Sequence, residues 1–320
     1  MHFNYPGLLS GVRIGTRVSP AALARAQRVE QLIASHAPGL NTEIVRVETV
    51  GDRRRGSRPL LSGPGTFARE VHRALLRDQV DVAVHAMKEI PGDLPLPEGT
   101  TFGAYLPRTD VRDVAVFPVD SPYRSLAEAP EGARVGVTSL RRAAQLLHHW
   151  PHLRVEGIRE ETTGALTLLD SGDRYTALVL ARSRVERLDR KDRVTESLPA
   201  DTVCPAPGTG VIGLQCRVDD DPMGELLHRL DDPETRTHVT AERTLLRGLR
   251  GHDASPIAAY CHTLPDGRLH LRGRVFTRDG SCVVEAFGCD APERPARLGT
   301  QVAADLLRQG ARALIAPGGR

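Results

Sequence analysis

The sequence predicts an α/β protein with two lobes of mixed sheets joined by a hinge, followed by a small α+β domain. Strand-like and helix-like segments alternate over residues 12–104 and again over 114–181. A strand at 211–216 has no sheet of its own nearby, so we expect it to return to the first sheet. Two crossings between the lobes would result. After residue 256, three consecutive strands are separated by turn-forming residues, which indicates a meander.

These patterns give three domains within 320 residues. We expect a first lobe of residues 1–104 plus 205–221, a second lobe of 105–204 and a C-terminal α+β domain of 222–320. A chain of this length accommodates two or three domains. Its 40% content of hydrophobic residues is enough to form a core in each of them.

The first lobe opens with a strand at Val12–Arg17. Ser19 and Pro20 then supply a helix cap and a proline at the first helical position, which predicts a helix to about His36. The other elements expected here are a strand at 42–49, a polar glycine-rich loop at 51–65, a helix at 67–76 and a buried strand that starts at 80.

The other two domains follow from the same patterns. The second lobe is expected to contain strands at 114–117, 135–138, 153–157 and 178–181, with helices at 139–150 and 162–169. The C-terminal domain is expected to contain helices at 223–230, 237–249 and 294–314, with strands at 257–263, 269–276 and 282–288.

Composition excludes several classes of function. A formal charge of +3 and 4% aromatic residues argue against a nucleic-acid partner. No apolar run approaches the ~18 residues of a membrane helix, and the N-terminus lacks a signal-peptide pattern. The five cysteines are odd in number and show no Cys-x-x-Cys spacing, so we expect neither a disulfide framework nor a metal site. The expected location is the cytoplasm.

The stretch Val80–Pro91 is the first candidate site. Its alternating residues predict a buried strand, and His85, Lys88 and Glu89 stand at its carboxyl end. Ligands of open α/β sheets bind beyond the carboxyl ends of strands, so this is a candidate active-site edge. Lys88 is one of only two lysines in an arginine-rich chain. The alternative is a strand that runs into a solvated turn.

Arginines at the ends of other strands form the second candidate. Arg17 ends the first strand, and Arg141 and Arg142 follow Thr138 and Ser139 at a junction between strand and helix. Helix N-termini and guanidinium groups both favour anions, and arginine binds carboxylates through two hydrogen bonds. The alternative is ordinary capping beside solvated arginines. The run Gly208-Thr209-Gly210 lacks a phosphate-binding spacing and predicts a hinge turn.

Four motifs together resemble one enzyme family. The runs 13–24, 80–91, 136–142 and 205–217 are similar, in order, to the signatures of hydroxymethylbilane synthase, also called porphobilinogen deaminase. The resemblance covers nearly the whole chain. It implies two lobes like those of periplasmic binding proteins and a small third domain, in agreement with the pattern above.

The resemblance also implies a chemistry. Enzymes of this family join four porphobilinogen units head to tail and release ammonia each time. An aspartate holds the pyrrole N–H, arginines and lysines bind the acidic side chains, and a cysteine carries a dipyrromethane cofactor. A monomer that binds an acidic pyrrole is expected. The corresponding positions here are Glu89 and Lys88 as catalytic residues and Arg17, Ser19, Arg69, Thr138, Ser139, Arg141, Arg142, Arg159 and Arg187 as substrate-binding residues.

Several positions depart from the family pattern. The cofactor loop reads Gly251-His252-Asp253-Ala254-Ser255-Pro256-Ile257-Ala258, so Asp253 replaces the attachment cysteine. A carboxylate cannot form the stable thioether that a thiolate forms. Glu89 replaces the catalytic aspartate, and an added methylene displaces its carboxylate by about 1 Å. The other departures are Ala86 for a serine, Pro64 and Arg69 for lysines, Glu160 and Glu161 beside Arg159, and Thr209 for a glutamine.

From these departures we expect no cofactor. The leading hypothesis is a divergent deaminase that binds porphobilinogen or a related pyrrole carboxylate and forms an azafulvene that another nucleophile traps. Two alternatives remain open from the sequence. One is an ordinary hydroxymethylbilane synthase that works weakly or with a non-covalent primer. The other is a binder of pyrroles or polyacids without catalytic activity.

Overall fold

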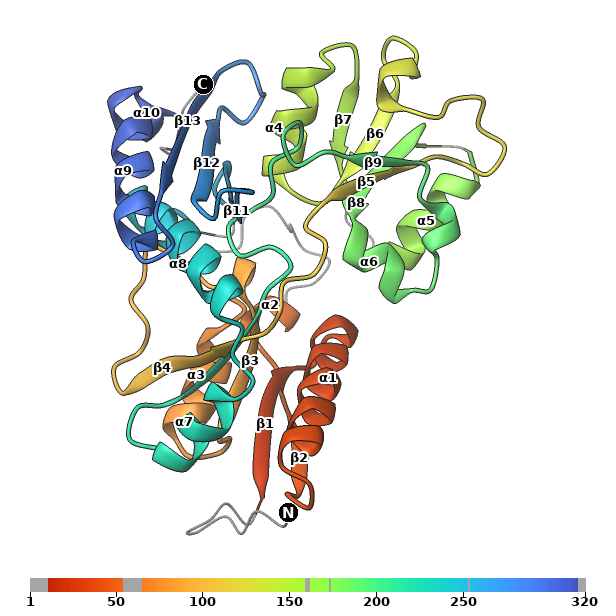
Figure 1. The fold of residues 1–320 in the computed structure, drawn as a ribbon. Coiled ribbons are helices and arrows are strands. Elements are labelled where there is room, and N and C mark those ends of the chain that lie inside the picture. Colours follow the sequence, from red (N-terminus) through yellow and green to blue (C-terminus); the bar gives the residue numbers. More distant parts are fainter. Residues whose placement is uncertain (1–10, 54–64, 159–161, 173, 253, 316–320) are drawn as a thin grey trace.

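The computed structural model describes residues 11–53, 65–158, 162–172, 174–252 and 254–315. Three sheets form three bodies, as Figure 1 shows, and the chain passes from the first to the second and back before it enters the third. The predicted fold class, two lobes with mixed sheets plus a small α+β domain, is confirmed.

The first lobe is built on a five-stranded sheet in the order β2–β1–β3–β10–β4. Strands β1, β2 and β3 are parallel, while β10 runs antiparallel to both β3 and β4. The return of residues 211–216 to the first sheet is therefore confirmed. The strands are β1 (Val12–Arg17), β2 (Thr42–Val47), β3 (Val82–Ala86), β4 (Thr100–Tyr105) and β10 (Ile212–Arg217), and the helices are α1 (Pro20–His36), α2 (Val50–Arg53), α3 (Arg69–Leu76) and α7 (Asp221–His228).

Helix α7 belongs physically to this first lobe. Met223, Leu226 and Leu227 are buried in the same hydrophobic cluster as Ile14 of β1 and Leu214 of β10. We propose that the lobe includes α7 and so extends past residue 221.

The second lobe contains a sheet in the order β7–β6–β8–β5–β9. Strands β6, β7 and β8 are parallel, and β5 pairs antiparallel with β8 and β9. Two buried clusters cover the two faces of this sheet, one around Phe117 and Leu146 and the other around Leu169 and Leu178. The elements are β5 (Asp113–Val116), β6 (Arg134–Val137), α4 (Leu140–His149), β7 (Arg154–Gly157), α5 (Thr162–Asp170), β8 (Ala177–Ala181), α6 (Arg182–Arg187) and β9 (Glu196–Leu198).

The C-terminal domain is a three-stranded antiparallel meander with helices on one face. Leu245, Leu271 and Val302 share its core, which lies between the sheet and the helices. The elements are α8 (Pro233–Gly248), β11 (Ile257–Thr263), β12 (Leu269–Phe276), β13 (Val283–Asp290), α9 (Pro295–Arg308) and α10 (Ala311–Ile315). The expected single helix at 294–314 is thus two helices, because Gly310 adopts a φ of 92° between them.

A buried ion pair ties all three bodies together. Glu242 of α8 is fully buried and accepts two hydrogen bonds from Arg108, at 2.7 and 2.8 Å. It also accepts one from the backbone N–H of Gly208, at 2.7 Å, and one from that of Cys261, at 2.8 Å. One carboxylate therefore joins the first crossing, the second crossing and the third sheet.

Candidate active site

The carboxyl end of β3 is held rigidly from several sides. The strand is buried throughout and passes into a single 3₁₀ turn, Met87–Glu89. The turn at Gly208 lies directly beneath it, since a Cβ on that glycine would sit 2.8 Å from the Cβ of Met87. Gly208 also has a positive φ of 74°. The predicted hinge turn therefore supports the backbone that carries Lys88 and Glu89.

The C-terminal domain also contacts this segment. Arg243 of α8 donates hydrogen bonds to the carbonyl groups of Ile90 and Pro91, at 3.1 and 3.2 Å. The carbonyl of Gly251 accepts from the N–H groups of Gly92 and Asp93. Gly251 is consequently anchored beside the segment that follows Glu89.

Glu89 forms an ion pair with Arg17 at the end of β1. The distance from Arg17 Nη1 to the Glu89 carboxylate is 2.7 Å, and the Glu89 side chain keeps 24% exposure. Burial alone would raise the pKa of Glu89. The positive charges of Arg25, Arg17 and Lys88 outweigh burial and hold this pKa below its ordinary value. Glu89 is therefore an ionised carboxylate that remains partly accessible.

Arg17 is itself fixed by a second acid. Its Nη2 donates to Asp52 at 2.7 Å, and both side chains are almost fully buried. Asp52 also accepts from the Thr49 hydroxyl at 2.7 Å. The Arg17 guanidinium lies 4.2 Å from the centre of the Phe67 ring. Arg17 is thereby held as a bridge between two carboxylates.

Lys88 has no ion pair or hydrogen bond from its ammonium group to any residue that the structure describes. Burial lowers its pKa to about 7, and Arg184 and Arg142 act in the same direction. Glu89 opposes that shift only in part. At the carboxyl end of the buried strand, Lys88 is thus a cation that is paired with no acidic side chain of the described residues.

Arg141 and Arg142 are engaged within the second lobe. Both donate to the carboxylate of Asp113 on β5, each at 2.7 Å. Arg142 also donates to the hydroxyl of Thr138 at 2.8 Å. Asp113 is buried, and Arg142 and Arg141 outweigh the effect of burial and lower its pKa to about 2. A substrate-binding role for the two arginines stays a prediction, because a carboxylate of the protein already occupies them.

The two predicted serines are helix caps. The Ser19 hydroxyl accepts from the N–H of Ala22 at the start of α1. The Ser139 hydroxyl accepts from the N–H of Arg142 at the start of α4. His85, at the end of β3, is a core residue. Its Nε2 lies 3.0 Å from the amide oxygen of Gln215, and burial lowers its pKa to about 3.

Two arginines at the site were missed from the sequence. Arg25 of α1 acts electrostatically on Glu89, and Arg184 of α6 acts on Lys88. Both look like ordinary surface positions in an arginine-rich chain. A signal for Arg25 was available, because it lies three residues after buried Ala22 and four before buried Val29. It therefore borders the apolar face of α1.

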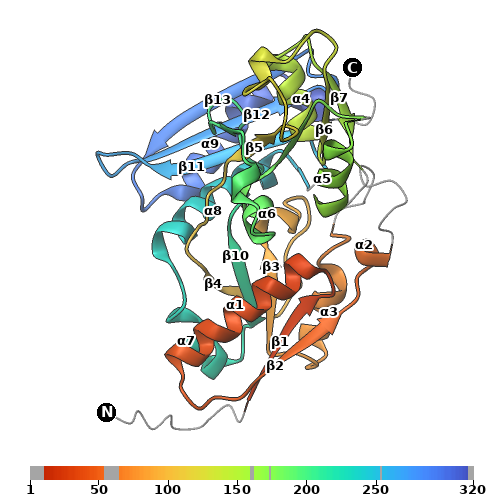
Figure 2. The same ribbon diagram turned by 90° about the vertical axis from the view of Figure 1, so that its right-hand side faces the viewer.

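We call the region where these side chains meet the lobe junction; its residues are Arg17, Arg25, Lys88, Glu89, Arg142, Arg184 and Arg187. Arg187 is on α6 and is exposed. Figures 1 and 2 both show α6 beside the end of α1 that follows β1. Among the described residues, Arg25, Lys88 and Arg187 have no acidic partner. These three unpaired cations can bind the acidic groups of a ligand.

Other predicted positions lie elsewhere. Arg69 begins α3 and is exposed, and it is not among the cations that dominate the pKa of Glu89. Arg159, Asp253 and Pro64 lie outside the described residues. No group of three or more histidine, cysteine or acidic side chains in the described part of the chain is placed to hold a metal. No described helix is long and apolar enough to cross a membrane.

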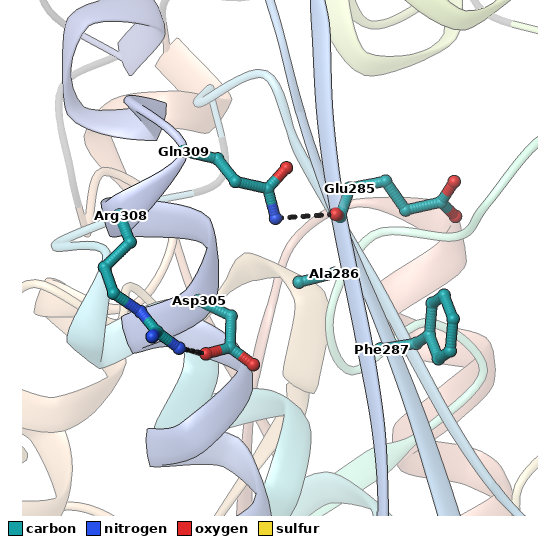
Figure 3. Close-up of a pocket in the computed structure, with 6 residues that line it drawn as sticks. All are labelled: Glu285, Ala286, Phe287, Asp305, Arg308 and Gln309. Carbon is teal, nitrogen blue, oxygen red and sulfur yellow. Dashed lines mark hydrogen bonds and ion pairs between the residues drawn. The ribbon is translucent and has the colours of Figure 1, made fainter.

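Two shallow surface pockets lie apart from the lobe junction. One, of about 410 Å³, is between β13 and α9, where Gln309 donates to the carbonyl of Glu285 at 2.9 Å (Figure 3). The other, of about 830 Å³, includes Pro118 and Arg174 in the second lobe. Neither contains Lys88 or Glu89. Neither brings together the ionised groups that the candidate chemistry needs.

Comparison with known proteins agrees with the motifs. Residues 12–225 match the family model "Porphobilinogen deaminase, dipyromethane cofactor binding domain", and 236–308 match "Porphobilinogen deaminase, C-terminal domain". The chain is 44% identical over 304 residues to porphobilinogen deaminase 2 of Streptomyces coelicolor, covering 95% of this chain and 96% of that protein. It is 42% identical over 308 residues to porphobilinogen deaminase of Acidithiobacillus ferrooxidans, covering 95% and 97%.

Solved structures overlap with the lobes only partially. The VFT2 domain of BvgS from Bordetella pertussis is 18% identical, with a TM-score of 0.42 over 69% of this chain and 86% of that one. The methionine-binding protein MetQ is 12% identical, with a TM-score of 0.41 over 70% and 90%. No inference about a ligand follows from overlaps of this size.

The comparisons correct one prediction. We expected no cofactor, because Asp253 stands where the family has its attachment cysteine. The family model that matches residues 12–225 is that of a dipyrromethane cofactor-binding domain, so this prediction is wrong. The error came from equating the loss of one covalent bond with the loss of the whole binding site.

Proposed function

Because this chain belongs to the porphobilinogen deaminase family, we propose that it deaminates porphobilinogen and links the pyrrole units, as a transferase of the hydroxymethylbilane synthase type. The observation that supports this most is the lobe junction. It combines one accessible carboxylate, Glu89, with three cations that have no acidic partner among the described residues. Porphobilinogen has complementary groups, namely a pyrrole N–H and two carboxylates.

In the proposed reaction, Glu89 accepts a hydrogen bond from the pyrrole N–H. The aminomethyl nitrogen of the substrate is protonated; its bond to the methylene carbon breaks, and the electron pair leaves with ammonia. The positive charge that develops on the pyrrole is stabilised by the carboxylate, which Arg17 holds in place at 2.7 Å. A pyrrole carbon of the growing chain then forms the new bond and loses its proton. Lys88 and Arg187 bind acidic side chains of the substrate.

The described residues fit the acidic groups of a dipyrromethane cofactor, but the residues of the lobe junction include no cysteine for its attachment. All five cysteines lie in the described part of the chain. Cys204, Cys216 and Cys261 are buried, and burial raises the pKa of each thiol. Cys282 and Cys289 are on or next to β13, the outer strand of the third sheet. When bound, the cofactor supplies the pyrrole carbon to which the first unit is joined.

We propose that ion pairs with its acidic groups, rather than a thioether, hold the dipyrromethane. Mass spectrometry of protein produced in a host that makes porphobilinogen tests this. A dipyrromethane adduct is expected under native conditions and should disappear after denaturation. An adduct that survives denaturation would show a covalent bond, and peptide mapping would then locate it.

Turnover tests the function itself. Incubation with porphobilinogen should consume the pyrrole and release one ammonia for each unit. Glu89→Gln should lower the rate about 10²- to 10³-fold, because it removes the charge that stabilises the transition state. Glu89→Asp should lower it about 10²-fold, since the shorter side chain withdraws from Arg17. Binding without any consumption would favour a protein without catalytic activity.

A gain in turnover from Glu89→Asp would oppose the proposed role of the longer side chain. A cytoplasmic location, a monomeric state and the absence of a nucleic-acid partner remain predictions from the sequence.

A further inference from the structure

Arg25 is the most unusual cation of the lobe junction. Its Nε atom is buried and has no hydrogen-bond partner within the described ranges of the chain. No carboxylate among the described residues is paired with the Arg25 guanidinium. A buried donor without a partner destabilises the folded protein, and more so when the group is charged. A residue with this cost calls for a compensating role, such as binding a ligand that supplies the missing acceptor.

The charges around Arg25 indicate which ligand would fit. Burial lowers its pKa, Glu89 opposes this shift, and Arg187 and Arg17 reinforce it. Glu89 is already paired with Arg17 through a 2.7 Å hydrogen bond. In the part of the chain that the structure describes, the acidic residue that acts on Arg25 is thus already engaged by another arginine.

Arg187 approaches from the opposite lobe. It is on α6, and both ribbon views show α6 beside the start of α1 (Figures 1 and 2). Like charges at a partly buried junction repel each other strongly. A carboxylate placed between the two guanidinium groups would reverse that repulsion. It would also accept hydrogen bonds from both lobes at once.

We infer that Arg25 is a specificity-determining residue that, together with Arg187, binds one carboxylate side chain of the pyrrole substrate. This inference rests on the proposed function. The planar guanidinium matches a carboxylate through two parallel hydrogen bonds, which an amide or a lysine cannot reproduce. The contact joins α1 to α6, so the bound carboxylate also holds the two lobes together.

Kinetics of an Arg25→Gln variant provide the test. The expected result is a KM for porphobilinogen raised about 10- to 100-fold with kcat changed less than about threefold, as for loss of a charge-assisted hydrogen bond. Arg25→Lys keeps the charge but cannot form two parallel hydrogen bonds to a carboxylate. Its KM should therefore lie between that of the wild type and that of Arg25→Gln. Arg28→Gln is the matched control, because Arg28 is exposed on the same helix. Its KM should equal that of the wild type.

Two substrate analogues make the assignment specific. One lacks the acetate carboxyl group of porphobilinogen and the other lacks the propionate carboxyl group. Arg25→Gln should weaken binding of only one analogue, because the other lacks the group that Arg25 contacts. Equal weakening of both would overturn the inference. So would a KM within twofold of the wild-type value.

A structural role would give different results. If Arg25 only keeps Glu89 ionised, Arg25→Gln would shift the acid limb of the kcat/KM profile to higher pH and leave substrate affinity unchanged. That outcome also overturns the inference. Thermal unfolding of each variant checks that the fold is intact. Wild-type protein that neither binds nor consumes porphobilinogen would defeat the proposed function, whereas active wild type with an unaffected Arg25→Gln variant would defeat only this inference.

Discussion

Lys88 places an ammonium group among other cations at the lobe junction. We therefore expect substrate binding to depend on pH. Burial, Arg184 and Arg142 lower its pKa from 10.5 to about 7. Binding of a carboxylate requires the charged form. The KM for porphobilinogen should therefore rise as pH increases above about 7, by up to about tenfold per pH unit. Initial rates between pH 6 and 9 give this profile.

The matched variant for that profile is Lys88→Arg. Arginine stays charged throughout this range, so the rise in KM should disappear. Deprotonation of Lys88 should weaken substrate binding but should stabilise the folded protein. Unfolded Lys88 keeps its proton to about pH 10, whereas the folded protein releases it near 7, so the free energy of unfolding should increase with pH over this interval. A flat KM profile in the wild type would contradict the assigned pKa.

Single residues also show how far the sequence could predict the site. Lys88 and Glu89 were found because they follow an alternating buried strand. The junction of strand and helix predicts that Arg141 and Arg142 bind an anion, and in the structure both pair with Asp113. That pairing joins positions 28 and 29 residues apart, which no local pattern encodes. Arg25 was missed because its environment depends on a second lobe.

Asp113 on strand β5 forms ion pairs with Arg141 and Arg142 at the start of α4. Asp113→Asn would leave Arg141 and Arg142 buried without a counter-charge. We expect the free energy of unfolding to fall by about 3–5 kcal/mol. Urea denaturation measures this change. Asp110→Asn is the control, since Asp110 pairs with a half-exposed Arg112 and should cost less than about 1 kcal/mol.

Asp113 should also make the stability of the protein depend on pH in the acidic range. The folded pKa of Asp113 is about 2, below its ordinary value of 3.8. Its contribution, roughly 2 kcal/mol, is therefore present above pH 4 and is lost as pH falls toward 2. If Asp113→Asn unfolds at the same urea concentration as the wild type at pH 7, the ion pairs are not stabilising.

Elements with strong periodicity or clear caps were predicted well. The first strand and helix have the expected bounds, because Ser19 and Pro20 mark the helix start unambiguously. Helix α6 and strand β9 were not predicted. They are six and three residues long, too short for a period to emerge. Their positions are set by packing on β8 and by pairing with β5.

At the scale of the whole molecule, Glu242 couples the three bodies. It binds Arg108 and the backbone of both Gly208 and Cys261. Glu242→Gln would leave Arg108 without a counter-charge. We expect unfolding to become easier by about 3–5 kcal/mol and to split from one transition into two. Urea denaturation followed by circular dichroism and by fluorescence of Trp150 should separate the transitions.

Glu234→Gln is the control on the same helix, because the Glu234 side chain is 66% exposed. It should unfold like the wild type. A single unshifted transition for Glu242→Gln would mean that the three bodies are joined mainly by their apolar contacts.

The lowered pKa of Lys88 has a consequence for covalent chemistry. Acylating reagents attack only an unprotonated amine, and an ordinary lysine is unprotonated in roughly one molecule in three thousand at pH 7. About half of Lys88 is unprotonated there. Lys191 is the only other lysine, so the competing amines are that side chain and the N-terminus. A reporter group could therefore be attached at the lobe junction of the unmodified sequence, and an aldehyde could form an imine at that same nitrogen.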